Sequence, residues 1–377
     1  MTRRFSKLRM LLLAGAAFSA CLTCHAQQFV YTNDNIAESN STTALTVSSK
    51  GSVTVLHSYA TGGRGIGDSG FLASQPIASA QTAEKWCLFV SNSGSSNIAA
   101  FQVDVKNGSL TTVQGSPFSD GASGRQSYGM SLATGAGKLL FAANTTSNTI
   151  SVMKISSDCA LKLTSTTEVS YAPVGLKVTP NGNFLIASYL GPVDSFKIDY
   201  ETGSVTELGP FAAQGPTAGI AIRCDGFKVF FGDENQFGET QVEAFLIHQN
   251  GQLSELDNFT DTHGKNSSNV LLSASQTQLY VTNNGSSQIT ALSVAKNGHL
   301  AFEDITTLDH PGEYALGLAT NAAGNMLFVS EVNNPEAIGA LVENGTALKE
   351  VPKSPFPVVD NDKAFASLIA VPTYTCP

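Results

Sequence analysis

Apolar and polar positions alternate along this chain in a pattern that recurs seven times. Each copy is a short apolar run that ends in a cluster of polar, turn-forming residues. Self-similarity at such a spacing is typical of repeat architectures, in which each unit buries its apolar face against its neighbours. The copies are QFVYTND (28–34), LFVSNSG (88–94), LFAANTT (140–146), FLIASYL (184–190), VFFGDEN (229–235), LYVTNNG (279–285) and LFVSEVN (327–333).

The pattern predicts four strands in each repeat. In the fourth repeat, VGLKVTP (174–180) is an apolar inner strand, and Asn181-Gly182 turns the chain into FLIASY (184–189). Asn-Gly is a strong hairpin signal because both residues tolerate positive φ. Residues 193–200 form an alternating third strand, and 204–211 close the unit. The tripeptide Ser-Pro-Phe recurs at 116–118 and 354–356, after an outer strand.

The spacing of the second strands identifies the fold class. Four-stranded units that recur every ~40–50 residues are the signature of a β-propeller. Here the spacings are 52, 45, 44, 50 and 48 residues, measured between Phe89, Phe141, Ile186, Phe230, Tyr280 and Phe328. We therefore expect an all-β, seven-bladed propeller of four-stranded blades.

The two ends of the repeat region predict how the ring closes. QFVYTND (28–34) reads as a second strand with no inner strand before it, and AFASLIAVP (364–372) reads as an inner strand without a blade. The last strand should complete the first blade, which removes the open sheet edges that promote aggregation. With no Pro- or Ser-rich linker in the sequence, we expect one propeller domain over residues 27–377.

The first 26 residues have the pattern of a signal peptide. Basic residues precede a short apolar stretch at 11–22, and Cys24-His25-Ala26 is a small-residue cleavage site. We therefore expect a periplasmic or secreted protein, cleaved near Ala26. Cleavage at Cys21 as a lipoprotein, or twin-arginine export through Arg3-Arg4, fits the residues less well.

Charge limits the kinds of partner. Removing the signal peptide takes away four positive charges and moves the net charge from −9 to −13. No basic patch remains for nucleic acid, and no later segment reaches the ~18 apolar residues of a membrane span. We expect a small-molecule ligand or a protein partner.

Four cysteines follow the predicted cleavage site, and export permits disulfides. Cys376 follows the inner strand of blade one, and Cys87 lies at the first hairpin of blade two. Because these positions share one face of adjacent blades, we expect a Cys87–Cys376 disulfide across the closure. Two buried or free thiols are the alternative. Cys159 and Cys224 lie two blades apart and are left unpaired, and no CxxC spacing suggests a metal site.

The repeats resemble a known family. LYVTN (279–283), LFVSN (88–92), the Ser-Pro-Phe segments and the Asn-Gly hairpins are similar to the seven-bladed lactonase propellers of the YVTN type, which include 6-phosphogluconolactonases. The resemblance covers essentially the whole mature chain. It implies opening or closing of a sugar or organic-acid lactone, with no cofactor.

The sequence departs from the catalytic members of that family at two motifs. The place of a His-Pro-His run is taken here by Tyr171-Ala172-Pro173-Val174-Gly175. The place of Gly-Pro-Arg-His is taken by Gly215-Pro216-Thr217-Ala218, whereas an acid that follows the next second strand is retained as Glu234.

The candidate site residues lie on loops at one mouth of the predicted channel. Lactone hydrolysis needs a base that activates water and a donor that stabilises the oxyanion. Glu234 or Glu331 with His263 are candidates for the first role, and Arg125 for the second. Candidate substrate-binding residues are Arg64, Tyr128, Asp233, Glu313 and Lys363. The structural alternative for each is a solvated loop charge.

Other patterns have structural interpretations. The asparagines at the second-strand ends, Asn33, Asn92, Asn144 and Asn283, suit hydrogen bonds to the next turn. Gly65, Gly67 and Gly70 match GxGxxG, but no βαβ unit surrounds them, so residues 61–70 are interpreted as a flexible connection and a candidate lid. No serine-hydrolase elbow, HExxH or calcium loop occurs.

Two functional hypotheses follow. The first is a lactone hydrolase that acts at the channel mouth. The second is a non-catalytic exported propeller that binds a carbohydrate or a protein. Convergence of His263, Arg125 and the acids Glu234 and Glu331 on one cavity would favour the first.

Overall fold

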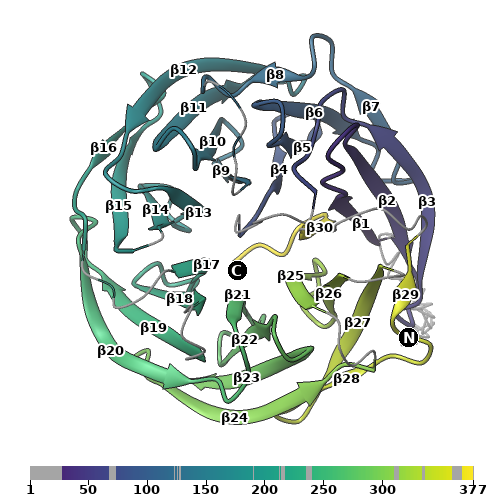
Figure 1. The fold of residues 1–377 in the computed structure, drawn as a ribbon, viewed down its shortest axis with the longest axis vertical. Coiled ribbons are helices and arrows are strands. Elements are labelled where there is room, and N and C mark those ends of the chain that lie inside the picture. Colours follow the sequence, from purple (N-terminus) through teal and green to yellow (C-terminus); the bar gives the residue numbers. More distant parts are fainter. Residues whose placement is uncertain are drawn as a thin grey trace, which may run out of the picture.

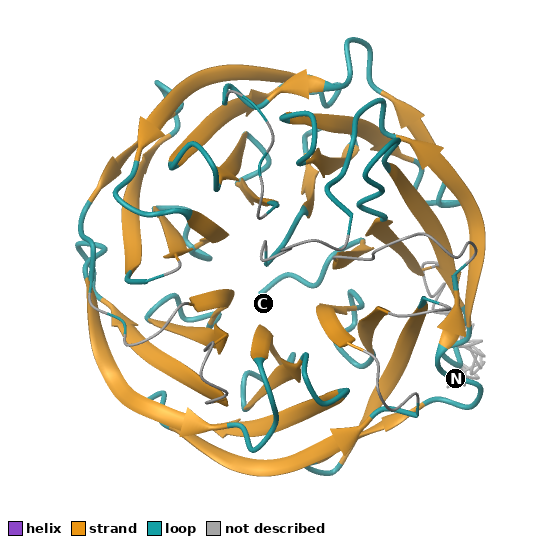
Figure 2. Ribbon diagram, in the orientation of Figure 1, coloured by secondary structure: helices purple, strands orange, loops and turns teal. Residues whose placement is uncertain are grey.

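The computed structural model describes most of the mature chain. The described residues are 28–67, 74–122, 124, 126, 129–189, 191–211, 213, 217–234, 240–309, 314–332, 336–358 and 367–376. The predicted signal peptide, residues 1–26, lies outside them. Within the described residues all regular structure is β-strand, arranged as a ring of sheets around a central channel (Figures 1 and 2).

Seven antiparallel sheets form the ring, and each is named here from the channel outward. Blade one consists of β30 (Ser367–Val371), β1 (Gln28–Asn33), β2 (Ser41–Val47) and β3 (Val53–Ala60). Blade two consists of β4 (Ile77–Gln81), β5 (Trp86–Asn92), β6 (Asn97–Val103) and β7 (Leu110–Thr112), with β8 (Phe118–Ser119) also paired to β6. Blade three consists of β9 (Met130–Gly135), β10 (Leu139–Asn144), β11 (Thr149–Ile155) and β12 (Leu161–Glu168).

The other four blades continue the ring. Blade four consists of β13 (Pro173–Val178), β14 (Phe184–Tyr189), β15 (Val193–Asp199) and β16 (Ser204–Glu207). Blade five consists of β17 (Thr217–Ile222), β18 (Lys228–Glu234), β19 (Thr240–Ile247) and β20 (Leu253–Asp261). Blade six consists of β21 (Ser267–Leu272), β22 (Gln278–Asn283), β23 (Gln288–Val294) and β24 (Leu300–Thr307). Blade seven consists of β25 (Tyr314–Thr320), β26 (Leu327–Val332), β27 (Ala337–Asn344) and β28 (Ala347–Glu350), with β29 (Phe356–Pro357) also paired to β27.

The predicted fold class and closure are confirmed. β30 pairs antiparallel with β1, and the register places Val30 opposite Ala370 and Asn33 opposite Ser367. The C-terminal strand therefore supplies the inner strand that the N-terminal repeat lacks, and the first blade ties the two ends of the propeller together (Figure 1).

The core lies between the blades. Seven apolar clusters are built from the described residues, and each joins the facing sides of two adjacent blades around the full ring. The second-strand aromatics that marked the repeats fill these layers, since Phe89, Phe141, Phe230 and Phe328 are all fully buried. Burial of each such side chain contributes about 1.5–3 kcal/mol, so inter-blade packing holds the ring closed.

The Asn-Gly hairpins form where they were predicted, with a different division of roles. Only the glycines take positive φ, for example Gly108 at +77° and Gly251 at +88°. The asparagines instead accept a hydrogen bond two residues on, as Asn107 Oδ1 does from the Ser109 amide and Asn250 Oδ1 from the Gln252 amide. Such Asx turns position the chain for the glycine that follows.

In blades two and seven, a Ser-Pro-Phe segment divides the outer edge of the sheet into two short strands. Ser116 Oγ accepts a hydrogen bond from the Ala100 amide at 2.9 Å, and Ser354 Oγ accepts one from the Ala340 amide at 3.0 Å. Both Ser-Pro bonds are cis. The phenylalanine that follows begins a short strand on the same partner, which is why blades two and seven each carry a fifth strand.

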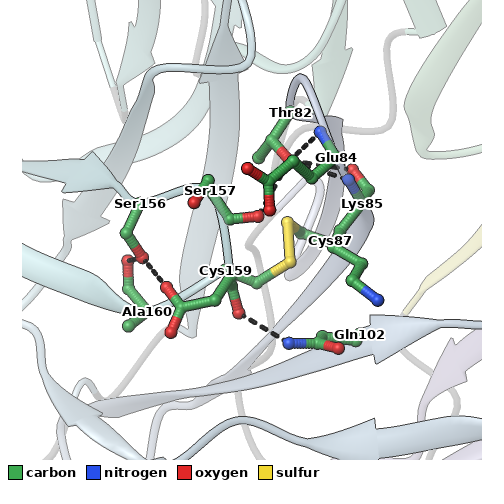
Figure 3. The surroundings of a disulfide bond; sticks show 10 residues. Thr82, Glu84, Lys85, Cys87, Gln102, Ser156, Ser157, Cys159 and Ala160 are labelled. Atoms are coloured by element: carbon green, nitrogen blue, oxygen red, sulfur yellow. Dashed lines mark hydrogen bonds between the residues drawn. A yellow bond between two sulfur atoms is a disulfide. The ribbon is translucent and has the colours of Figure 1, made fainter.

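The disulfide prediction is wrong. Cys87 pairs with Cys159, not with Cys376, and Cys376 pairs with Cys224. Cys87 on β5 is bonded to Cys159 in the β11–β12 hairpin of blade three, and both cysteines are buried (Figure 3). Beside this bond, Gln102 Nε2 donates to the Asp158 carbonyl at 3.0 Å, so the bond links two blades at a packed contact (Figure 3).

The path of the C-terminal tail explains the difference. After β30 the tail does not pass to blade two but runs across the channel, where the C-terminus is drawn in Figure 1. Thr373 pairs with Asn321 in blade seven, and the Tyr374 hydroxyl donates to the Ala274 carbonyl of blade six at 3.0 Å. Cys376 thereby reaches Cys224, in the β17–β18 hairpin of blade five.

Candidate functional site

The second-strand asparagines are structural, as the sequence indicated. Asn283 is fully buried; its Nδ2 donates to Thr290 Oγ1 at 2.8 Å, and its Oδ1 accepts from the hydroxyls of Thr262 and Ser267, each at 3.1 Å. Asn144 Nδ2 donates in the same way to Ser151 Oγ at 2.8 Å. These amides therefore join the second strand to the third strand and hold the ends of the blades together.

Glu331 takes the place of such an asparagine in blade seven. Like Asn283 in β22, it pairs with the first residue of the following strand, here Ala337. Its side chain is 1 % exposed, and a Cβ on Gly339 would clash with its Oε1 atom. Gly339 corresponds in register to Thr290, the partner of Asn283. The absent side chain at Gly339 thus makes room for a buried carboxylate at an otherwise structural position.

Blade five carries two further candidate acids, Asp233 and Glu234. Glu234 is the last residue of β18 and pairs with Thr240. Asp233 precedes it and is 2 % exposed. In register the equivalent of Glu331 is Asp233, which follows Phe230 by three residues as Glu331 follows Phe328. Glu234 and Glu331 therefore do not occupy equivalent positions in their blades, and the side chain of Glu234 lies outside the described part.

His263 lies at the outer rim. It follows β20, an outer strand, and its ring is 4.4 Å from the ring of Phe302 on β24, the outer strand of the next blade. Its Nδ1 is 3.0 Å from Asp261 Oδ2, and its backbone has a φ of 58°, held by a hydrogen bond from its amide to Asp261 Oδ1. The structure does not bring this histidine next to Glu331, which lies inside blade seven.

The connection at residues 61–67 is tied to the loops of blades one and two. The amides of Gly65 and Gly67 donate to the carbonyls of Ile36 and Asn35, and the Gly94 amide donates to the Arg64 carbonyl at 2.8 Å. A Cβ at Gly65 would clash with the Asn35 backbone. The glycines therefore serve close backbone approach. The Arg64 side chain is exposed, and this part of the segment is an anchored strap; residues 68–70 lie outside the described range.

Four further candidates, Arg125, Tyr128, Glu313 and Lys363, lie outside the described residues. Their convergence with Glu234 stays a prediction.

A cavity of about 280 Å³ occupies the central channel. It is lined by the inner strands of all seven blades and by Thr373 and Tyr374 of the tail. The volume lies near the lower end of the ~300–1,000 Å³ of small-molecule sites.

Lys177 on β13 lines this cavity. It is the one charged residue in the seven inner strands. The side chain stays accessible to water in the channel, but the surrounding protein partly desolvates its ammonium and lowers its pKa below the ordinary value, and no charge pair accounts for the shift. Lys177 is not among the site residues predicted from the sequence, although a signal was available: VGLKVTP (174–180) is the one inner-strand segment that places a charge among apolar residues.

The described ranges contain neither a candidate metal cluster nor a candidate membrane-spanning helix. There, no three His, Cys, Asp or Glu side chains gather closely enough to hold a metal ion. The same ranges contain no helix with the length and apolar content needed to cross a membrane.

Part of the sequence matches a known family. Residues 82–222 match the family described as "Lactonase, 7-bladed beta-propeller". The chain resembles the lactonase propellers. The match confirms the resemblance that the repeats indicated, and it spans parts of blades two to five. A search of curated proteins gave no match.

Solved structures share the fold over nearly the whole chain. A candidate 6-phosphogluconolactonase from Bacteroides fragilis superimposes with a TM-score of 0.74 at 19% identity, covering 93% of this chain and 99% of that one. The periplasmic gluconolactonase of Pseudomonas aeruginosa gives a TM-score of 0.65 at 17% identity, with coverages of 93% and 99%. A protein from Lactobacillus plantarum gives 0.67 at 17% identity, with coverages of 92% and 99%. At these identities the likeness establishes the seven-bladed architecture.

Proposed function

We propose that the chain is a hydrolase of a sugar or organic-acid lactone. The match of residues 82–222 to the lactonase propeller family carries this proposal. The names of the Bacteroides and Pseudomonas structures, a candidate 6-phosphogluconolactonase and a gluconolactonase, support the same substrate class. A propeller fold alone accommodates many functions, so the activity has to be tested on this chain.

The reaction needs few groups. A base removes a proton from water, the oxygen attacks the lactone carbonyl, and the resulting oxyanion collapses with cleavage of the ring C–O bond. The ring oxygen takes up a proton and the product is a hydroxy acid. A base of this kind contributes about 10²–10⁴-fold to the rate.

We assign the base to Glu234 in preference to Glu331. Glu234 is the last residue of β18 and Glu331 is the residue before the last of β26. Glu331 is enclosed against Gly339 and is almost fully buried. A base must reach the water that it deprotonates, which favours the acid of blade five. Arg125 remains the candidate for the oxyanion donor.

The test is proton release by the mature chain, from Gln27, on a panel of sugar and organic-acid lactones. We expect turnover above the spontaneous rate, a loss of at least about 100-fold in Glu234→Gln, and retained kcat in Glu331→Gln as the matched control. Turnover that neither substitution alters would refute this mechanism, and the absence of turnover on the whole panel would refute the hydrolase.

A non-catalytic binding module is the second candidate. The rim position of His263, together with the replacement of the two histidine-containing family motifs, favours it. If the lactone panel shows no turnover, calorimetric titration with the matching hydroxy acids and neutral sugars tests binding. Saturable binding without turnover would support the module.

We also propose that the protein is exported to the periplasm or secreted. The pattern of residues 1–26 and the two disulfides support this location, because disulfides persist in oxidising compartments. Intact-mass analysis of the protein from the extracytoplasmic fraction should give a chain that begins at Gln27. A lipid-modified chain beginning at Cys21, or an uncleaved chain in the cytoplasm, would contradict the assignment.

A further inference from the structure

The central cavity has walls of small side chains at the level of Lys177. In β13, Lys177 lies opposite Ile186 of the second strand. The residues at the equivalent inner-strand position of the other blades are mostly alanine: Ala78, Ala133, Ala221, Ala319 and Ala370, with Leu271 in blade six. Four of these alanines, Ala78, Ala133, Ala319 and Ala370, line the cavity and leave space in the channel, and the longest side chain at this level carries a charge.

No acid among the described residues neutralises Lys177. The lysine takes part in none of the ion pairs or side-chain hydrogen bonds found among the described residues. Its side chain is accessible to water, and the accessible surface faces the cavity, where protein on all sides lowers the pKa of the ammonium. The other titratable group in the described lining is Tyr374, whose hydroxyl donates to the Ala274 carbonyl.

An unpaired cation in such a place needs an explanation. Lysines are rarely surrounded by protein without a partner, because desolvation of the charge is costly. The chain contains 30 acidic residues, yet none is placed opposite this amine within the described lining. A charge that the fold leaves without a counter-ion, in a cavity large enough for a molecule, is a candidate for ligand recognition.

The C-terminal tail closes one end of the channel. Thr373 and Tyr374 line the cavity and are held by contacts with Asn321 and Ala274. The Cys224–Cys376 disulfide then fastens the tail to blade five. The tail therefore acts as a floor, and the channel is a pocket at this end.

We propose that the central channel is a binding site for a small organic carboxylate, whose negative charge pairs with Lys177. The walls combine apolar side chains, such as Leu132, Leu176 and Ile220, with neutral polar groups, and Lys177 is the only cation in the described lining. One cation in such a cavity balances one negative charge. A phosphate dianion would leave a net charge desolvated in the same cavity. Hydroxyl and amide groups in the lining, among them Thr134, Asn269 and Thr320, suit a carboxylate that carries hydroxyl groups. This site does not depend on the proposed lactonase activity.

The test compares gluconate with sorbitol, which lacks the carboxylate, and with inorganic phosphate, by calorimetric titration of the mature protein. We expect saturable binding of gluconate, no binding of sorbitol, and at least a tenfold weaker affinity in Lys177→Met. Lys138→Met, which removes an exposed lysine from the β9–β10 hairpin, should bind like the unmodified protein. Equal affinity in Lys177→Met, no binding of gluconate, or tighter binding of phosphate than of gluconate would overturn the proposal.

A second measurement does not require a variant. In protein labelled with ¹⁵N-lysine, the pKa of Lys177 should rise when gluconate saturates the site, because the carboxylate stabilises the ammonium form. An unchanged pKa at saturation would overturn the assignment. The double variant Cys224→Ser/Cys376→Ser should bind gluconate more weakly, and an unchanged affinity would contradict the role of the tail as a floor. Since binding is measured, failure of lactone turnover has no bearing on these outcomes.

Discussion

Glu331 and Gly339 occupy complementary positions on neighbouring strands of blade seven: the carboxylate of the first fills the space that the second leaves by having no side chain. In blades three and six, an amide–hydroxyl pair fills the corresponding place, Asn144 with Ser151 and Asn283 with Thr290. One scaffold thus accepts either a polar pair or a single longer acid at the end of the second strand.

We predict that Gly339→Ala destabilises the protein. The new Cβ would lie 2.6 Å from Val329 Cγ1 and would also clash with Glu331 Oε1, and such overpacking costs about 1–3 kcal/mol of unfolding free energy. Urea denaturation measures the loss. The double variant Glu331→Ala/Gly339→Ala should recover part of it. Strict additivity of the two single variants would show that the two residues do not interact.

The asparagine network gives a second prediction. Asn283→Ala should lower the unfolding free energy by about 1–3 kcal/mol, because the buried hydroxyls of Thr262, Ser267 and Thr290 each lose one of their hydrogen-bond partners. Asn297→Ala, which removes an exposed hairpin asparagine, serves as the control and should cost less. A larger loss in the exposed variant than in the buried one would contradict the structural role assigned to Asn283.

The disulfide connectivity can be read directly by mass spectrometry of a non-reduced digest. We expect peptides that link Cys87 with Cys159 and Cys224 with Cys376. Removing the first pair as Cys87→Ser/Cys159→Ser should cost about 2–5 kcal/mol, since it releases a constraint over 72 residues between blades two and three. A linked Cys87–Cys376 peptide would instead restore the pairing expected from the sequence.

Asp120 gives a prediction about pH. Burial raises the pKa of this carboxyl to about 6, against the opposing effect of the Ala122 amide, which donates to its Oδ1. Between pH ~4 and ~6 the unfolded chain loses this proton while the folded chain keeps it, so folding stability falls as pH rises through that window. Asp120→Asn should remove this fall and gain about 1–3 kcal/mol at pH 7.

The matched control for Asp120 is Asp199, which should behave with the opposite sign. The amide of Thr202, together with that of Glu201, lowers the pKa of this exposed carboxyl, so its contribution is present at neutral pH and is lost as pH falls. Thermal melts of both asparagine variants from pH 3 to pH 8 compare the two. An Asp120→Asn variant whose stability relative to the unmodified protein does not change with pH would contradict the assignment.

The repeats in the sequence were enough to predict the blades. A blade is a local structure: its strands follow one another, its hairpins carry Asn-Gly, and its second strand carries a buried aromatic such as Phe89 or Phe328. The closure was also readable, because the orphan strand at 364–372 had only one blade left to complete. The structural role of Asn92, Asn144 and Asn283 could be predicted for the same reason, since each donates to a residue of the adjacent strand. Asn33 instead donates to Ser91 of blade two.

The candidate site was harder to predict, because it depends on where side chains from different blades point. The sequence placed His263 and Glu331 on loops at one mouth of the channel, yet one packs against Phe302 at the rim and the other against Gly339 inside a blade. Lys177 was not predicted as a site residue. Its charge becomes distinctive only when the other six inner strands are known to surround the same cavity and to carry no charge.

The amino-acid sequence by itself determined the number of blades, their four-stranded plan and the strand that closes the ring, because these follow from local periodicity and turn chemistry. The tertiary structure alone decided which cysteines meet, since the direction of the tail after Val371 depends on contacts with Asn321 and Ala274, 50 and nearly 100 residues away. It also decided that Lys177 faces an enclosed cavity, because a channel exists only when all seven inner strands stand around one axis.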